Sequence, residues 1–176
     1  TLKFSPNDYP LEPGLRLLEA SAGTGKTFAL AHLVLRLLTE GKHSINEILV
    51  VTFTEAAAAE LKARISARIH AALIGLESSE EVIETNEFDE VLKDWIQTKV
   101  KGDKSRLHWA SLLLEALENI DLADITTIHG FCNRTLRREA IDSNASISPI
   151  LEEDNSELVF EVIHDYWQHQ FLKLKP

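Results

Sequence analysis

The chain has 176 residues, of which 44% are hydrophobic, and it carries a single cysteine and a formal net charge of −10. This length supports one domain-sized core, and one thiol can form neither an internal disulfide nor a cysteine-rich metal site. The net negative charge argues against general electrostatic binding of nucleic acid, because such binding needs clustered lysine and arginine.

Residues 1–14 are rich in proline and predict an irregular segment. They lack the basic start and apolar stretch of a secretory leader, and no run in the chain approaches the roughly 20 apolar residues of a membrane helix. We therefore expect a cytoplasmic protein with no membrane partner. Because Thr1 is not a natural initiator and the chain stops just after an aromatic-rich helical pattern, we also expect an excised fragment.

A short apolar run at Leu15–Glu19 predicts a buried strand that leads into Ala20–Thr27, with the sequence Ala-Ser-Ala-Gly-Thr-Gly-Lys-Thr. A helical pattern follows from Lys26 to about Glu40 and ends at Gly41. A strand, a glycine-rich loop ending in Gly-Lys-Thr and a helix are typical of a phosphate-binding loop, whose backbone N–H groups surround a polyphosphate. The alternative is a tight strand-to-helix turn with a solvated lysine.

The residues of this loop have distinct expected roles. Gly23 and Gly25 allow positive φ and a close approach of the backbone to phosphates. Lys26 would reach the β- and γ-phosphates of ATP, and the Thr27 hydroxyl would hold Mg²⁺, so these two residues are the catalytic candidates. Ala20 replaces the usual first glycine. The predicted nucleotide-binding residues are Ala20, Ser21, Ala22, Gly23, Thr24, Gly25, Lys26 and Thr27.

The next elements predict a second strand and a long helix. Ile48–Phe53 is almost purely apolar and β-branched, which is typical of a parallel strand covered on both faces. Thr54 can cap a helix from Glu55 to about Leu76, whose apolar stripe would lie on the sheet. Many of the acidic residues then lie between Glu77 and Asp94, and this stretch predicts a solvated insertion. The rest of the chain is nearer to charge balance, so the net charge does not exclude a DNA partner.

The rest of the chain alternates between helical patterns and one short strand. The predicted elements are helices at Phe88 to about Val100 and Ser105 to Asn119, a strand at Asp124–Ile128, and helices at Gly130 to about Ala140 and Asn155 to Leu172. Strands and helices in alternation, with an inserted helical pair, predict an α/β fold with a doubly wound parallel sheet.

Two segments resemble DNA motifs of the UvrD-like superfamily 1 helicases. Ile48–Ile65 resembles motif Ia, Thr127–Arg137 resembles the next motif, and both follow the phosphate loop in the family's order. Glu19–Phe28 and Thr127–Cys132 most closely resemble the RecB-type branch, the beta subunit of exodeoxyribonuclease V. The AddA-type helicase-nucleases are the nearest alternative.

The resemblance implies a RecA-like P-loop NTPase fold and a partial first motor domain, whose motor uses ATP and Mg²⁺ to translocate on single-stranded DNA and unwind duplex ends in recombinational repair. It implies single-stranded and duplex-end DNA and the RecC-type and RecD-type subunits of a heterotrimeric complex as partners. The implied parts are 1–14, an irregular segment; 15–76, the core with the phosphate loop and motif Ia; 77–120, the acidic helical insertion; 121–146, the core with the second DNA motif; and 147–176, the start of a helical subdomain.

The resemblance also implies a DNA path at two strand ends, lined by Phe53, Thr54, Thr127, His129, Gly130 and Arg134. Phe53 would stack on a base, and Thr54 would bind a phosphate at a helix N-terminus. The alternatives are a core aromatic at Phe53, a plain helix cap at Thr54 and a histidine that only braces its loop at His129.

Parts of a complete ATPase are missing. The sequence shows no acidic pair after an apolar strand and no partner-domain arginine, and Leu11-Glu12-Pro13-Gly14 stands where the family's adenine-reading glutamine would lie. We therefore expect this chain alone to bind nucleotide weakly without turnover. A P-loop small-molecule kinase and a non-catalytic interaction module, docking through the acidic insertion and the terminal helix, stay open as alternatives.

Overall fold

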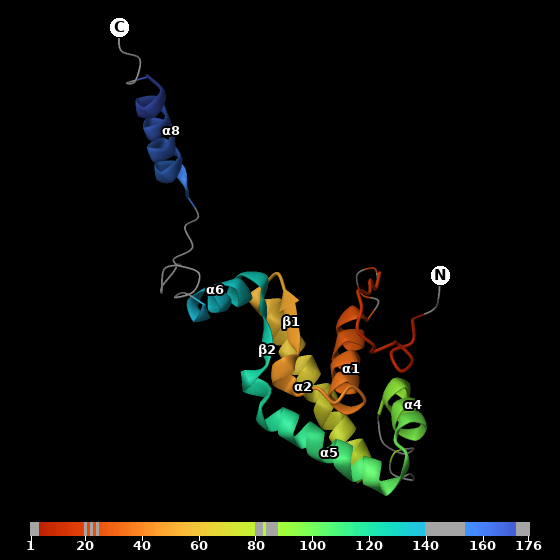
Figure 1. The fold of residues 1–176 in the computed structure, drawn as a ribbon. Coiled ribbons are helices and arrows are strands. Elements are labelled where there is room, and N and C mark those ends of the chain that lie inside the picture. The colour runs from red at the N-terminus through yellow and green to blue at the C-terminus, as the bar shows by residue number, and fades with distance from the viewer. Residues whose placement is uncertain are drawn as a thin grey trace. The chain divides into compact units, whose positions relative to one another are not determined.

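The computed structural model describes residues 4–19, 21, 23, 25–79, 83, 88–139 and 154–171. The chain divides into two compact units, Thr1–Phe131 and Cys132–Pro176. The described elements are α1 (Lys26–Thr39), the 3₁₀ turn η1 (Ile45–Glu47), β1 (Leu49–Thr52), α2 (Glu55–Glu77), α4 (Glu90–Lys99), α5 (Gly102–Glu118), the 3₁₀ turn η2 (Ile120–Leu122), β2 (Asp124–Thr127), α6 (Ile128–Arg138) and α8 (Ser156–Phe171) (Figure 1).

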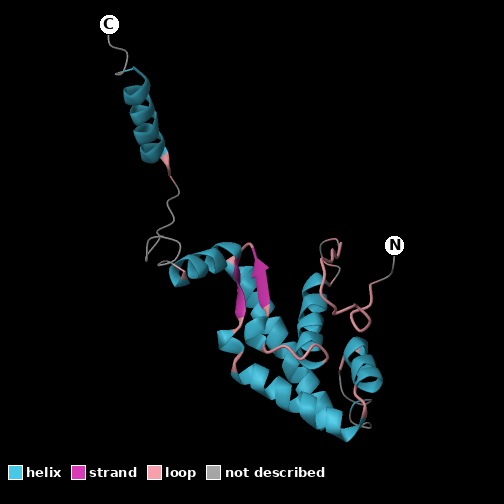
Figure 2. Cartoon of the chain, in the orientation of Figure 1, coloured by secondary structure: helices cyan, strands magenta, loops and turns pink. Residues whose placement is uncertain are grey.

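The sheet of the first unit has two parallel strands in the described part of the chain. Leu49 pairs with Asp124 and Thr52 with Thr127, and Figure 2 shows the two strands side by side. Parallel strands need a crossover connection, which here contains α2, α4 and α5. Both strands therefore end at the same edge of the sheet, as the predicted parallel arrangement requires, and the α/β class is confirmed.

The predicted strand at Leu15–Glu19 is wrong, since residues 15–19 form a loop and the side chains of Leu15 and Leu17 are 102% and 83% exposed. A strand is stable only where its backbone groups pair with a neighbour and its apolar side chains are covered. The expected cover on both faces of Ile48–Phe53 is also wrong for the described residues, because Leu49 and Val51 are each 45% exposed. An apolar run shows that a strand can be buried, and its neighbours decide whether it is.

Helices α1, α2 and α5 pack against one another and form the core of the first unit (Figure 1). The expected helical stripe is confirmed, because Leu61, Ile65 and Ile69 of α2 are all buried. Thr54 caps α2 as predicted, its side chain accepting a hydrogen bond from Ala57 N at 3.2 Å. Asp89 caps α4 in the same way, accepting from Leu92 N at 3.1 Å.

The acidic stretch is only partly the solvated insertion that the sequence predicts. Glu77, Asp89 and Glu90 are exposed, but Leu92 and Trp95 of α4 have no exposed area and belong to the core. Trp95 stacks on Trp109 of α5, with the ring centroids 5.3 Å apart. An amphipathic helix can carry many acidic residues on one face and still close a core with the other.

In the second unit, α8 confirms the predicted last helix, and Trp167 stacks on Phe171 with the ring centroids 4.2 Å apart. Helix α6 follows β2 directly and continues across the boundary between the units. No helix among the described residues has the length and apolar content needed to cross a membrane.

Candidate nucleotide and nucleic-acid sites

The loop before α1 has the backbone conformation that its glycines allow. Gly23 and Gly25 have φ values of 77° and 86°, and a Cβ added at either position would meet no atom within 4 Å. Glycine is therefore needed here for the left-handed backbone and not for space. Gly25 is the N-cap of α1 and places Lys26 at the first position of the helix.

The predicted lysine lies at the surface of this loop. The Lys26 ammonium donates a hydrogen bond to the Ser21 carbonyl oxygen at 2.6 Å, and the Lys26 side chain is exposed. Thr27, in the first turn of α1, is partly exposed. Three predicted nucleotide-binding residues, Ala20, Ala22 and Thr24, lie outside the described residues. The nucleotide-binding roles of the others stay predictions.

A cavity of about 470 Å³ opens beside the loop, within the range of small-ligand pockets. Its polar lining includes Ser21 and Lys26, and its apolar lining includes Phe4, Pro6 and Phe28. The sequence analysis missed Phe4 and Pro6. Nothing in the local sequence of an irregular segment shows that it folds back against the phosphate loop.

Hydrogen bonds hold the segment that carries Pro6 against α1. Arg36, which is 4% exposed, donates to the carbonyl oxygens of Pro6 at 2.8 Å and of Tyr9 at 2.7 Å. Asn7 is also 4% exposed and donates to the carbonyl oxygen of Val91 in α4 at 3.0 Å. The wall of the cavity is therefore fixed by polar side chains that lie behind it.

Four residues form a polar cluster behind the loop: Asn7, His32 and Arg68, which are buried, and Asp89, whose side chain is 43% exposed at the rim of the cluster. His32 has no exposed area, and its Nδ1 accepts a hydrogen bond from Arg68 Nε at 3.1 Å. Its Nε2 lies 2.6 Å from Asn7 Oδ1, so the proton of the neutral ring is on Nε2 and is donated to Asn7. Arg68 also pairs with Asp89, and its guanidinium lies 4.7 Å from the centre of the Phe28 ring.

The electrostatics of the cluster favour a neutral histidine. Burial lowers the pKa of His32 to about 3, and the positive charges of Arg68 and Arg36 act in the same direction. Burial opposes ionisation of Asp89, but its hydrogen bond and charge pairing with Arg68 outweigh burial and lower its pKa overall. Both ring nitrogens of His32 are engaged, which makes the cluster a support for the cavity wall and not an acid–base catalyst.

The end of β1 presents the predicted DNA-contact residues to solvent. Phe53 directly follows β1 and is 85% exposed, so it is not the core aromatic of the alternative reading. Thr54 and His129 are also exposed. Thr54 is a helix cap, and a cap of this kind remains compatible with phosphate binding.

Thr127, at the end of β2, differs from the other predicted contact residues. Its side chain is 5% exposed and its hydroxyl donates to Glu55 Oε1 at 2.9 Å. The Thr127 hydroxyl oxygen also accepts a hydrogen bond from Gly130 N at 3.0 Å. A Cβ at Gly130 would lie 2.7 Å from Thr126 Oγ1, so glycine lets α6 begin directly against the strand. Direct DNA contact by Thr127 stays a prediction, and its hydroxyl is engaged within the protein.

The structure brings together the predicted contact residues Phe53, Thr54, Thr127, His129 and Gly130 in the first unit, through the pairing of Thr52 with Thr127. We call these five residues together with Glu55 the strand-end edge. Arg134 is exposed on the part of α6 that belongs to the second unit. Glu55 is the residue that the sequence analysis missed, since its partner Thr127 lies 72 positions away.

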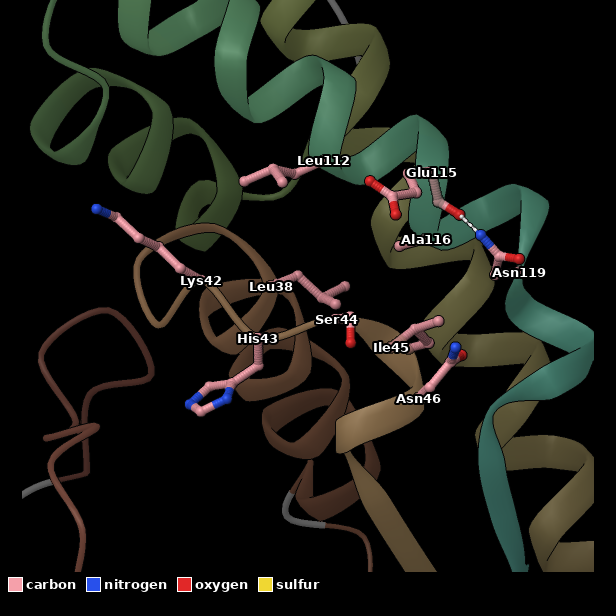
Figure 3. Close-up of a pocket in the computed structure, with 10 residues that line it drawn as sticks. All are labelled: Leu38, Lys42, His43, Ser44, Ile45, Asn46, Leu112, Glu115, Ala116 and Asn119. Carbon is pink, nitrogen blue, oxygen red and sulfur yellow. Dashed lines mark hydrogen bonds between the residues drawn. The ribbon is translucent and has the colours of Figure 1, made fainter.

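A second pocket, of about 130 Å³, lies at the other end of α1 and is shown in Figure 3. Leu38, Ile45 and Leu112 contribute apolar lining, while the side chains of Lys42 and His43 extend away from them. Within the described ranges, no group of three or more histidine, cysteine, aspartate or glutamate residues is placed to hold a metal ion.

Comparison with known proteins places this chain in a family. A family model described as the UvrD/REP helicase N-terminal domain matches residues 10–175. The RecBCD enzyme subunit RecB of Escherichia coli strain K12 is 40% identical over 94% of this chain and 14% of its own length. The subunit of the same name from Haemophilus influenzae is 35% identical over 99% of this chain and 15% of its length, and that of Mycolicibacterium smegmatis is 36% identical over 88% and 13%.

The chain therefore spans about 14% of the length of such relatives. Its resemblance to UvrD-like helicases, first indicated by the phosphate loop and the two motifs at the strand ends, is confirmed by a match over almost all of its residues. The chain belongs to the UvrD/REP helicase N-terminal domain family.

Proposed function

We propose that this chain is the amino-terminal ATP-binding part of a RecB-type DNA helicase and exonuclease subunit that unwinds duplex DNA ends for recombinational repair. In this proposal the fold is a RecA-like P-loop core in a cytoplasmic protein. Its partners are single-stranded and duplex-end DNA and RecC-type and RecD-type subunits. The observation that carries the proposal is a glycine-rich loop with an exposed lysine in the same compact unit as the strand-end edge.

The parts of the chain take the following roles in this proposal. Residues 15–76 and 121–146 supply the core of the motor, 77–120 form an insertion whose helices also complete that core, and 147–176 begin a helical subdomain. Residues 1–14 supply the wall of the nucleotide cavity through Phe4 and Pro6. The division follows the positions of the phosphate loop and the two DNA motifs.

ATP would bind with its phosphates at the loop and its base in the adjoining cavity. The Lys26 ammonium would leave the Ser21 carbonyl and move to the β- and γ-phosphates, because a phosphate oxygen gives a stronger, charge-assisted hydrogen bond. Thr27 would hold Mg²⁺ through its hydroxyl. Bound Mg²⁺ would neutralise charge that develops on the transferred phosphoryl group.

Single-stranded DNA would lie along the strand-end edge. The exposed ring of Phe53 would stack on a base, a contact that tolerates any sequence, while Thr54 and the helix starts at this edge would meet phosphates. Such contacts need little positive charge, which is compatible with a net charge of −10.

The experiment that tests this proposal measures DNA-stimulated ATP hydrolysis by the full-length protein with Lys26→Ala. We expect the loss of hydrolysis in this variant, because the phosphate-binding cation is removed. Lys42→Ala is the matched control, since Lys42 is an exposed lysine at the opposite end of α1. Equal activity of the two variants would reject the proposed nucleotide site, and phosphoryl transfer to a small molecule without DNA stimulation would favour a kinase.

The 176-residue chain by itself gives a second test. Calorimetric titration with Mg-ATP should show weak binding, and a phosphate-release assay should show no turnover, because the chain lacks the acidic pair and the arginine of a complete ATPase. Turnover that disappears in Lys26→Ala would contradict this expectation.

A further inference from the structure

We infer that Glu55 is a positioning residue for single-stranded DNA, because its bond to the buried Thr127 hydroxyl fixes the ends of β1 and β2 relative to each other. The inference rests on the proposed function, in which the strand-end edge carries the DNA. Glu55 itself need not touch the DNA. Glu55 lies two residues after Phe53, and its partner Thr127 lies two residues before His129, so the bond between them positions both of these side chains.

At the end of each strand, a threonine hydroxyl accepts a backbone hydrogen bond in the same way. The Thr54 hydroxyl oxygen accepts from Ala57 N at 3.2 Å, and the Thr127 hydroxyl oxygen accepts from Gly130 N at 3.0 Å, three residues further along in each case. Each hydroxyl caps the first turn of the helix that follows its strand. The two caps differ in their surroundings, because Thr54 is exposed and Thr127 is 5% exposed.

Burial makes the donor of Thr127 the critical group. A buried hydroxyl whose proton finds no acceptor costs more than the bond itself contributes, and here the acceptor is a carboxylate, which gives a charge-assisted bond. With Glu55 as acceptor, the side chain of Thr127 is held in the rotamer that also caps Gly130. Loss of Glu55 therefore releases the first turn of α6 as well.

The start of α6 lies close to the side chains at the end of β2. A Cβ at Gly130 would lie 2.7 Å from Thr126 Oγ1 and 3.0 Å from Thr127 Oγ1, so the start of α6 already lies directly against the strand. A change in the Thr127 rotamer would break the hydrogen bond from Gly130 N and loosen the helix start that carries His129. On the other side of the bond, Glu55 directly follows Thr54 and lies in the first turn of α2.

Glu55 has two simpler explanations that experiment can separate from positioning. A carboxylate in the first turn of α2 interacts favourably with the helix dipole. If this were the role of Glu55, Glu55→Gln would be as harmful as Glu55→Ala, because both variants lose the negative charge. A carboxylate at the DNA edge repels phosphate, which would make both variants bind DNA more tightly. Positioning requires only an acceptor for Thr127, so Glu55→Gln should behave like the wild type and Glu55→Ala should not.

The test measures the dissociation constant of a fluorescent oligothymidine for the full-length protein at low salt. Glu55→Ala and Thr127→Val should each weaken binding about tenfold, as expected for loss of one hydrogen bond to a charged group. The double variant should be no weaker than either single variant, while Glu55→Gln and Thr127→Ser should retain binding. Glu60→Ala is the matched control, because Glu60 is an exposed glutamate of α2 that pairs with Arg64.

A readout that needs no DNA separates this inference from the proposed function. Hydrogen exchange at the Gly130 amide should accelerate in Glu55→Ala and stay slow in Glu55→Gln, because only the former leaves Thr127 without an acceptor. Unchanged exchange in Glu55→Ala, or an additive double variant, overturns the positioning role. If the wild type binds no oligothymidine, the proposed DNA edge fails, and the exchange measurement still decides whether Glu55 fixes the two strand ends.

Discussion

The polar cluster behind the loop and the strand-end edge use polar side chains in different ways. In the cluster, Asn7, His32 and Arg68 are buried, and they bond one another or Asp89, whose side chain is 43% exposed at the rim. At the edge, two threonines make short-range caps, and a phenylalanine ring stays 85% exposed. The cluster thus supports the cavity beside the glycine-rich loop from behind, while the edge keeps its outward surface exposed.

Of the changes considered, removal of the Arg68 side chain should lower the stability of the protein most. Arg68→Ala leaves Nδ1 of His32 without its donor, Asp89 without its cation and the Phe28 ring without the guanidinium above it. We expect a loss of about 3 kcal/mol in the free energy of unfolding, the lower end for a broken buried pair, because the Asp89 side chain is 43% exposed. Denaturant unfolding followed by circular dichroism measures this loss.

Arg64→Ala is the matched control for Arg68→Ala. Arg64 lies one turn earlier on α2, and its side chain is 55% exposed and pairs with Glu60. Exposed ion pairs of this kind contribute at most about 1 kcal/mol, so this variant should lose much less stability. Equal losses in the two variants would mean that the cluster is not the structural support described above.

The second prediction concerns the pH dependence of the cluster. The folded-state pKa of His32 is about 3, below its ordinary value of 6.5, so acid protonates the unfolded chain before the folded one. The contribution of His32 is therefore complete above pH 6.5, and it is lost as the pH falls toward 3, at about 1.4 kcal/mol per pH unit. Lowering the pH from 6.5 to 5 should cost about 2 kcal/mol of unfolding free energy.

A histidine replacement tests the origin of this slope. His32→Gln should lower stability at neutral pH and remove most of the loss between pH 6.5 and 5. The lowered pKa values of Asp89 and Glu40 act in a different window, because carboxylates contribute above their ordinary values of 3.8 and 4.5 and lose that contribution at lower pH. A slope between pH 6.5 and 5 that persists in His32→Gln would assign it to other groups.

The third prediction concerns the close approach of α6 to β2 at the edge. An alanine usually stabilises a helix relative to glycine, but a Cβ at Gly130 would lie 2.7 Å from Thr126 Oγ1. We expect Gly130→Ala to lower stability by about 1–2 kcal/mol through overpacking. In a Thr126→Ala background the same change should cost less, since the nearer hydroxyl is gone, and an equal cost in both backgrounds would contradict the steric explanation.

The sequence predicted most of the local structure of the described residues. The helices were predictable because an apolar stripe repeats with the helical period and because Thr54 caps α2 through an atom three residues away. The two described strands were predictable from β-branched apolar runs. The predicted strand at residues 15–19 failed because a strand depends on a neighbour to pair with, which local spacing does not reveal.

The candidate sites divide in the same way. The glycine-rich loop and Phe53 stand out in the sequence, since each lies between an apolar run and a helix pattern. The bond between Glu55 and Thr127 and the contact of Arg68 with His32 join residues 72 and 36 positions apart. Such bonds depend on how α1, α2 and β2 pack, so they become visible only in the folded chain.

The smallest expected effect on stability is that of Phe53→Ala. This variant distinguishes the strand-end edge from the polar cluster, because it should change DNA affinity and leave stability almost unchanged. Because its side chain is 85% exposed, Phe53→Ala should change the free energy of unfolding by less than about 0.5 kcal/mol. The same variant should lose about 1–3 kcal/mol of affinity for labelled single-stranded DNA, the usual contribution of one stacked base. Leu122→Ala serves as the control, since Leu122 is 67% exposed on η2 and lies outside the strand-end edge. A large stability loss without a change in DNA affinity would assign Phe53 to packing, whereas the expected pattern would show that the edge binds DNA through a residue that contributes little to folding.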